Sequence, residues 1–199
     1  MIIALAQLNP TVGDLDGNRQ NIVAHAHRAA DRGADLVVFP ELAVTGYPPQ
    51  DLLEHPHFIE AVQQTTERII ADLPSGVGVI FGTPVPNGTS TGNRLFNAAL
   101  LVENGAVQAE VHKTLLPTYD IFDEHRYFEA AASRRVVEWR GVRLGLHICE
   151  DMWNVDEQAV HRLYECDPVD ELAAQGIDLF INISASPFSI GKPGVRDRL

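Results

Sequence analysis

Three polar residues that could do chemistry together each follow an apolar run typical of a buried strand. Glu41 comes after DLVVFP, Lys113 comes after AVQAEVH, and Cys149 comes after VRLGLHI. Ligands gather at the carboxyl ends of strands in α/β sheets, so these side chains would converge if the strands run the same way. The carboxylate could then take the thiol proton and later give it to a leaving amine. The ammonium could stabilise the thiolate and the oxyanion of a tetrahedral intermediate.

The stretch GLHICEDMW places two carboxylates, Glu150 and Asp151, directly after the candidate nucleophile. Neighbouring negative charge raises the pKa of a thiol and makes it less reactive. We expect both acids to point away from the sulfur and to occupy the first turn of a helix, where carboxylates complement the helix dipole. The backbone N–H of Glu150 could then complete an oxyanion hole, as the residue after the nucleophile does in other elbow-type turns.

Each of the three residues also has an ordinary structural explanation. A lone cysteine at the end of a strand is usually a packing residue. Lys113 could protect an edge strand from pairing with another chain, and Glu41 could be a surface loop residue. The pattern alone leaves these interpretations open.

Length, charge and cysteine content restrict the class of protein. The chain has 199 residues, 45% of them hydrophobic and 21% charged, which indicates one globular domain with a substantial core. A formal net charge of -12 argues against a nucleic-acid or anionic-membrane partner. Two cysteines make no disulfide framework, and the opening MIIALAQLNP lacks the basic flank of a secretory signal. We therefore expect a cytoplasmic protein.

Hydrophobic patterning predicts an α/β layered fold. Apolar runs predict four buried strands, at 2–8, 35–40, 77–83 and 178–184. Three helices are predicted, from Asp16 or Asn18 to Gly33, over 56–73 and at about 157–175. Two hairpins are predicted, with turns at Asn104-Gly105 and Arg140-Gly141. Mixed parallel and antiparallel strands covered by helices are typical of such a fold.

The segments around the three polar residues resemble the nitrilase, or carbon-nitrogen hydrolase, superfamily, and the resemblance runs through essentially the whole chain. FPELAVTGYPPQDLL carries the family glutamate at Glu41, HKTLLPTYDIFDEHRYF carries the lysine at Lys113, and LGLHICEDMW carries the cysteine at Cys149. The resemblance implies a Glu-Lys-Cys triad on a four-layer αββα sandwich. It also implies a second active-site glutamate at Glu124.

Four phrases in order resemble one branch of the superfamily, the glutaminase domains of glutamine-dependent NAD(+) synthetases. They are TGYPPQDLL, YDIFDEHRYF, ICEDMW and NISASPFSIGK. The resemblance implies that Tyr119, Ser186 and Lys192 contact the substrate L-glutamine, which the Glu150 N–H would contact through the oxyanion hole. The resemblance implies no cofactor for the glutaminase step, and the spacing of the histidines, in pairs two residues apart, indicates no metal site.

The superfamily fold continues beyond the point that corresponds to Leu199, so residues 1–199 are expected to be an incomplete hydrolase domain, truncated at its C-terminal end. The resemblance implies a parent chain with a synthetase domain, which would use ATP with Mg, and a homo-oligomeric parent. Two alternatives remain: another amidase or nitrilase of the superfamily acting on a different small amide, and a non-catalytic domain that only docks a synthetase domain.

Overall fold

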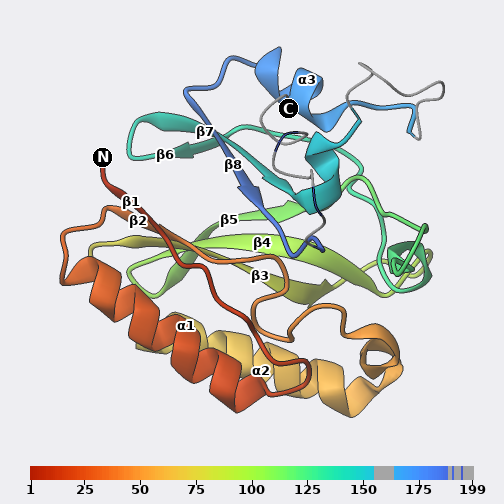
Figure 1. Cartoon of the computed structure of the whole chain (residues 1–199), viewed down its shortest axis with the longest axis horizontal. Coiled ribbons are helices and arrows are strands. Elements are labelled where there is room, and N and C mark those ends of the chain that lie inside the picture. The colour runs from red at the N-terminus through yellow and green to blue at the C-terminus, as the bar shows by residue number, and fades with distance from the viewer. Residues whose placement is uncertain (155–163, 188–189, 191–193, 195–199) are drawn as a thin grey trace.

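The computed structural model describes residues 1–154, 164–187, 190 and 194, which form a four-layer αββα sandwich. Figure 1 shows helices α1 (Leu15–Ala30) and α2 (Pro56–Asp72) on one side of a five-stranded sheet. A three-stranded sheet lies on the other side, and helix α3 (Pro168–Ala173) covers it. The architecture expected from the sequence is confirmed.

The five-stranded sheet has the order β1-β2-β3-β4-β5. Strands β1, β2 and β3 are parallel, whereas the β3/β4 and β4/β5 pairs are antiparallel, so β5 runs in the direction of β2. The carboxyl ends of β2 and β5 therefore lie at the same edge of the sheet. The strand bounds are β1 Ile3–Leu5, β2 Leu36–Val38, β3 Gly78–Pro86, β4 Leu95–Glu103 and β5 Ala106–His112.

The second sheet contains β6 (Val137–Trp139), β7 (Val142–Ile148) and β8 (Leu179–Ile183), in that order. Strands β6 and β7 form an antiparallel hairpin, and β7 and β8 are parallel. Both hairpin turns predicted from the sequence are present. Their central residues have positive φ, at 52° and 73° in Asn104-Gly105 and at 49° and 76° in Arg140-Gly141, as a type I′ turn requires.

Two apolar cores hold the layers together. Side chains of α1 and α2, including Ile22 and Val62, pack on one face of the first sheet. The opposite face of that sheet packs on the second sheet through residues such as Leu101 and Leu146. Alternate residues of β2, β3 and β4 thus face different cores, as the pleat dictates.

The segment before α1 and the first turn of α1 differ from the sequence expectation. The first strand is shorter than 2–8, and Asp14 caps α1 in place of Asp16 or Asn18, accepting a backbone N–H of the first turn at 3.0 Å. The buried Asn18 side chain instead bonds the backbone of Thr11 and Val44 and joins two loops.

Part of the helix expected at 157–175 lies outside the described residues. Within the part of the chain that is described, no helix is long and apolar enough to cross a membrane.

Candidate active site

Three side chains singled out by the sequence meet in a buried cluster where β2 and β5 end. The Lys113 Nζ lies 2.8 Å from Glu41 Oε1, and it lies 2.7 and 2.8 Å from the two oxygens of Glu124. The side chains of Lys113 and Glu41 are fully buried, and that of Glu124 is 6% exposed. Cys149 follows β7 and interacts electrostatically with all three groups.

Glu41 is held in place because the loop after β2 folds back on β3. The Gly82 N–H donates to the Pro40 carbonyl at 3.2 Å, and the Val44 N–H donates to the Gly82 carbonyl at 3.3 Å. A Cβ at Gly82 would lie 2.3 Å from the Leu42 nitrogen, so only glycine lets the two backbones approach this closely. This contact sets the position of Glu41.

Cys149 sits at an elbow between β7 and the residues that follow. Its φ is 45°, in the left-handed region that non-glycine residues rarely adopt, and the residue is 4% exposed. The Asn182 amide donates to its carbonyl at 3.3 Å, and the Ser184 hydroxyl donates to its sulfur at 3.2 Å. The elbow projects the thiol into the cluster.

Burial sets the resting protonation states of the site. Burial raises the pKa of the Cys149 thiol, and the Glu41 charge raises it further, while Lys113 and Ser184 oppose this shift. Burial alone would lower the pKa of Lys113, but the charges of Glu41 and Glu124 outweigh it and the pKa is raised. The pKa of Glu124 is raised, chiefly by burial. The resting site therefore holds a neutral thiol beside an ammonium ion.

Asp151 lies in the first turn of the helix that follows β7, as the sequence suggested, but this helix is a short 3₁₀ helix of four residues, Cys149–Met152. Its carboxylate accepts the backbone N–H groups of Thr114 at 2.9 Å, Leu115 at 2.8 Å and Ile148 at 3.0 Å. Burial raises the pKa of Asp151 to about 6. Asp151 thus ties the segment after Lys113 to the cysteine elbow, and these backbone hydrogen bonds hold its carboxylate in addition to its place in the first helical turn.

Glu150 faces two tyrosines. Its carboxylate accepts the Tyr119 hydroxyl at 2.9 Å on both oxygens and the Tyr164 hydroxyl at 3.1 Å. Burial, followed by the charge of Glu150, raises the pKa of both phenols, which remain hydrogen-bond donors. Because other groups engage Glu150 and Asp151, the sequence CED is compatible with a reactive cysteine.

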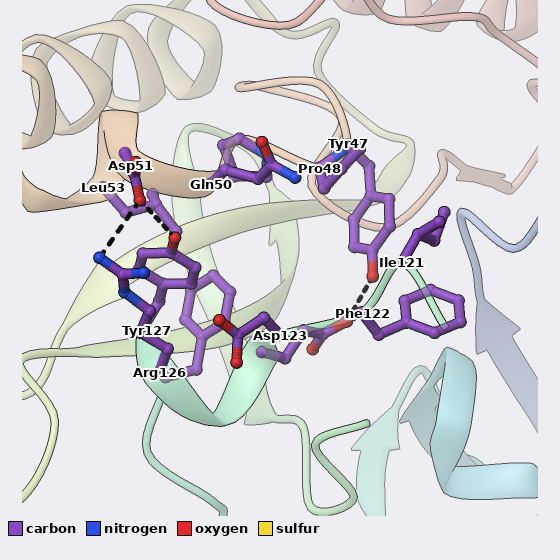
Figure 2. A pocket seen from close by; sticks show the side chains of 13 residues that line it. Tyr47, Pro48, Gln50, Asp51, Leu53, Ile121, Phe122, Asp123, Arg126 and Tyr127 are labelled. Atoms are coloured by element: carbon purple, nitrogen blue, oxygen red, sulfur yellow. Dashed lines mark hydrogen bonds and ion pairs between the residues drawn. The ribbon is translucent and has the colours of Figure 1, made fainter. Parts of the chain in front are cut away.

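Two cavities open beside the cluster. One, of about 490 Å³, is lined by Glu41, Ser184 and Ser186 among others. The other, of about 260 Å³, has Glu124 in its wall and is drawn in Figure 2. Tyr47 lines both cavities. Lys192, the last site residue expected from the sequence, lies outside the described residues.

The sequence profile of the carbon-nitrogen hydrolase family matches residues 2–193. The chain belongs to the carbon-nitrogen hydrolase family. A glutamine-dependent NAD(+) synthetase of Synechocystis sp. is 42% identical over 200 residues, a match that covers 99% of this chain and 36% of that protein.

Solved structures show the same similarity. A glutamine-dependent NAD+ synthetase from Acinetobacter baumannii superposes with a TM-score of 0.82 and 33% identity, covering 98% of this chain and 34% of that one. A Nesterenkonia AN1 amidase from the nitrilase superfamily superposes with a TM-score of 0.77 and 25% identity, covering 97% of this chain and 68% of that one. This carbon-nitrogen hydrolase chain thus spans about a third of the length of the synthetases.

Like Ser184, Asn97 and Tyr47 are residues of this candidate site that were missed from the sequence. The Asn97 amide donates to Glu41 Oε1 at 2.8 Å and to Glu124 Oε2 at 3.4 Å. The Tyr47 hydroxyl donates to Glu124 Oε1 at 2.7 Å (Figure 2). The signal for Asn97 was its position as a polar residue inside the apolar run RLFNAALLV, since a buried amide needs partners.

Proposed function

We propose that this chain is the glutamine amidohydrolase part of a glutamine-dependent NAD(+) synthetase. The observation that carries the proposal is the buried Lys113 ammonium, held by Glu41 and Glu124 beside the Cys149 thiol. Similarity to glutamine-dependent NAD(+) synthetases over nearly the whole chain supports glutamine as the substrate. In a structure of a Glu-to-Gln mutant of the Nesterenkonia amidase, the acetamide moiety of fluoroacetamide is covalently added at the active-site cysteine, which supports Cys149 as the nucleophile.

The hydrogen bonds of Glu124 give it a supporting role. Its Oε1 accepts from Lys113 and Tyr47, and its Oε2 accepts from Lys113 and Asn97. A carboxylate oxygen has about two lone-pair sites, so both oxygens are saturated. Glu124 therefore holds the ammonium in place and keeps it charged.

Glu41 keeps a free acceptor site with respect to the described residues and is the general base. Its Oε1 accepts from Lys113 and Asn97, both at 2.8 Å, whereas its Oε2 accepts the Ala185 N–H at 3.0 Å. Among the contacts of the part of the chain that is described, one lone pair of Oε2 remains for a proton. Oε2 is therefore the atom that takes the proton of Cys149.

Attack by the thiol and proton transfer take place together, because burial keeps Cys149 protonated at rest. The S–H bond breaks as the proton moves to Glu41, and the sulfur forms a bond to the side-chain amide carbon of glutamine. The amide oxygen becomes an oxyanion, which the positive charge of Lys113 stabilises electrostatically and the Glu150 N–H stabilises by a hydrogen bond.

The tetrahedral intermediate then expels ammonia, which takes its proton from Glu41 and leaves a glutamyl thioester on Cys149. Water attacks the thioester while Glu41 accepts one of its protons, and Glu41 returns this proton to the sulfur as the C–S bond breaks, which releases glutamate and restores the thiol. These steps need no metal or cofactor. In the parent enzyme the synthetase domain would use the ammonia, with ATP and Mg, to amidate nicotinic acid adenine dinucleotide.

Glutamine is proposed to bind in the cavity of about 490 Å³, which Ser186 and Glu41 line. Tyr119 is 44% exposed, and its hydroxyl bonds the buried Glu150. These residues are proposed to orient the substrate, together with Lys192. A cavity lined by a few convergent polar groups is typical of a small-molecule site.

The test is Cys149→Ala in the full-length enzyme, assayed for NAD(+) formation with glutamine and with ammonium chloride. The variant should lose glutamine-dependent synthesis and keep ammonia-dependent synthesis, because the thiol serves only amide cleavage. Cys166→Ala, which changes the other free cysteine, should keep both activities. Unchanged glutamine use by Cys149→Ala would refute the proposal, and preferential hydrolysis of another small amide by the wild type would favour a different amidase.

A further inference from the structure

Strand β8 delivers two consecutive residues to the two reacting groups of the cluster. The Ser184 hydroxyl donates to the Cys149 sulfur at 3.2 Å, and the next residue, Ala185, donates its backbone N–H to Glu41 Oε2 at 3.0 Å. The segment after β8 therefore touches both the sulfur that attacks and the carboxylate oxygen that takes the proton.

The position of Ser184 follows from the pairing of β7 and β8. The two parallel strands end together, with Ile148 opposite Ile183. Ser184 is the first residue beyond this ladder, beside Cys149, which is the first residue beyond β7. The Asn182 amide of β8 donates to the Cys149 carbonyl and supports the same register.

The Lys113 ammonium donates its hydrogen bonds to carboxylates and not to the sulfur. It makes hydrogen bonds of 2.7 to 2.8 Å to Glu41 and to both oxygens of Glu124. An ammonium has three N–H donors, and these contacts occupy them in the resting site. Among the described residues, the hydroxyl of Ser184 is the side-chain donor in hydrogen-bond contact with the sulfur.

We propose that Ser184 is a further catalytic residue, whose hydroxyl holds the Cys149 sulfur and stabilises the negative charge that the sulfur carries as it attacks. The Ser184 O–H bond stays intact throughout, since the thiol proton goes to Glu41. A hydrogen bond to a charged atom is stronger than one between neutral groups. Its loss should slow attack by about 10- to 100-fold. The inference rests on the proposed role of Cys149 as nucleophile.

The test compares Ser184→Ala with Ser184→Thr, which keeps a hydroxyl, in the full-length enzyme. Ser75→Ala is the matched control, because Ser75 is exposed and precedes β3, at the opposite end of the sheet from the cluster. One measurement is the rate of Cys149 alkylation by iodoacetamide across pH, located by peptide mass mapping. The other is the steady-state kcat and KM for glutamine, with thermal unfolding as a check on folding.

Ser184→Ala should slow Cys149 alkylation at any given pH by about 10-fold or more and lower kcat by about 10- to 100-fold, with a smaller change in KM. Ser184→Thr should recover most of both, and Ser75→Ala should match the wild type. If Ser184→Ala is poorly folded, Ser184→Gly provides a second variant without the hydroxyl. An alkylation profile that matches the wild type in a folded variant without the hydroxyl would overturn the proposal. Because alkylation does not need glutamine, this result stands even if the wild type proves not to be a glutaminase.

Discussion

At the scale of single residues, the central feature is a buried cation shared by two carboxylates. Lys113 separates Glu41 from Glu124, and without it two buried negative charges would repel each other. The two glutamates then differ in how many hydrogen bonds they can still accept, because among the described residues Ala185 alone donates to Glu41 Oε2. Two residues of the same type thus acquire different roles from their surroundings.

We predict that Glu41→Gln lowers kcat for glutamine by at least about 10³-fold, because the amide cannot accept the thiol proton. The change conserves shape, and the variant should remain folded by circular dichroism. Glu67→Gln, on the exposed face of α2, should turn over glutamine like the wild type. Near-normal turnover by Glu41→Gln would remove Glu41 from the role of base.

The limits of prediction from sequence are clearest at this scale. The phrases around Glu41, Lys113 and Cys149 singled them out through resemblance, since a lysine at a strand end is otherwise indistinguishable from an edge-strand lysine. Asn97 and Ser184 were missed because their hydrogen bonds join positions 56 and 35 residues apart. Such contacts depend on strand order and register, which local patterns do not specify.

At the scale of elements, apolar runs and turn residues predicted most strands and both hairpins, because burial and positive φ leave local signatures. The residue at which helix α1 begins was harder to predict. Asp14, Asp16 and Asn18 are all good caps by type, and the choice of Asp14 follows from the use of Asn18 to join two loops. The short turn after Cys149 was likewise decided by tertiary bonds, those of Asp151.

The contact between β3 and the loop after β2 gives a prediction at this scale. Gly82→Ala should push the loop away, since its Cβ would lie 2.3 Å from the Leu42 nitrogen, and should displace Glu41. A displacement of about 1 Å costs roughly 10²-fold in rate. Glutamine turnover and thermal unfolding check this. Gly88→Ala is the control, because nothing lies within 4 Å of that Cβ, and equal turnover by the two variants would contradict the argument.

At the scale of the whole molecule, the layers differ in character. The two cores on either side of the five-stranded sheet are apolar. On β7 and β8, however, the alternation of side chains places the register partners His147 and Asn182 on the face opposite Leu146 and Ile183. The outer face of the second sheet, under α3, therefore carries a buried imidazole that is 5% exposed.

This imidazole should make the stability of the fold depend on pH. The Asn182 amide donates to His147 Nδ1 at 2.8 Å, so Nδ1 must accept and the ring is neutral. Burial lowers the pKa of His147 to about 4, whereas an unfolded histidine titrates near 6.5. Below pH 6.5 His147 binds a proton in the unfolded chain, whereas in the folded chain it binds one only near pH 4. The free energy of unfolding should therefore fall as the pH falls through this window, by up to about 3 kcal/mol from this group.

We predict that His147→Asn removes this part of the acid sensitivity, since an amide oxygen can accept from Asn182 and does not titrate. Urea unfolding at intervals between pH 7.5 and 4.5 provides the measurement. The wild type should lose more stability than His147→Asn over this range, with a difference approaching about 3 kcal/mol at the acid end. His57→Asn, which changes an exposed histidine of α2, should lose stability in parallel with the wild type. If His147→Asn also follows the wild type in parallel, another group governs acid unfolding and the buried imidazole between β7 and α3 is not the sensitive site.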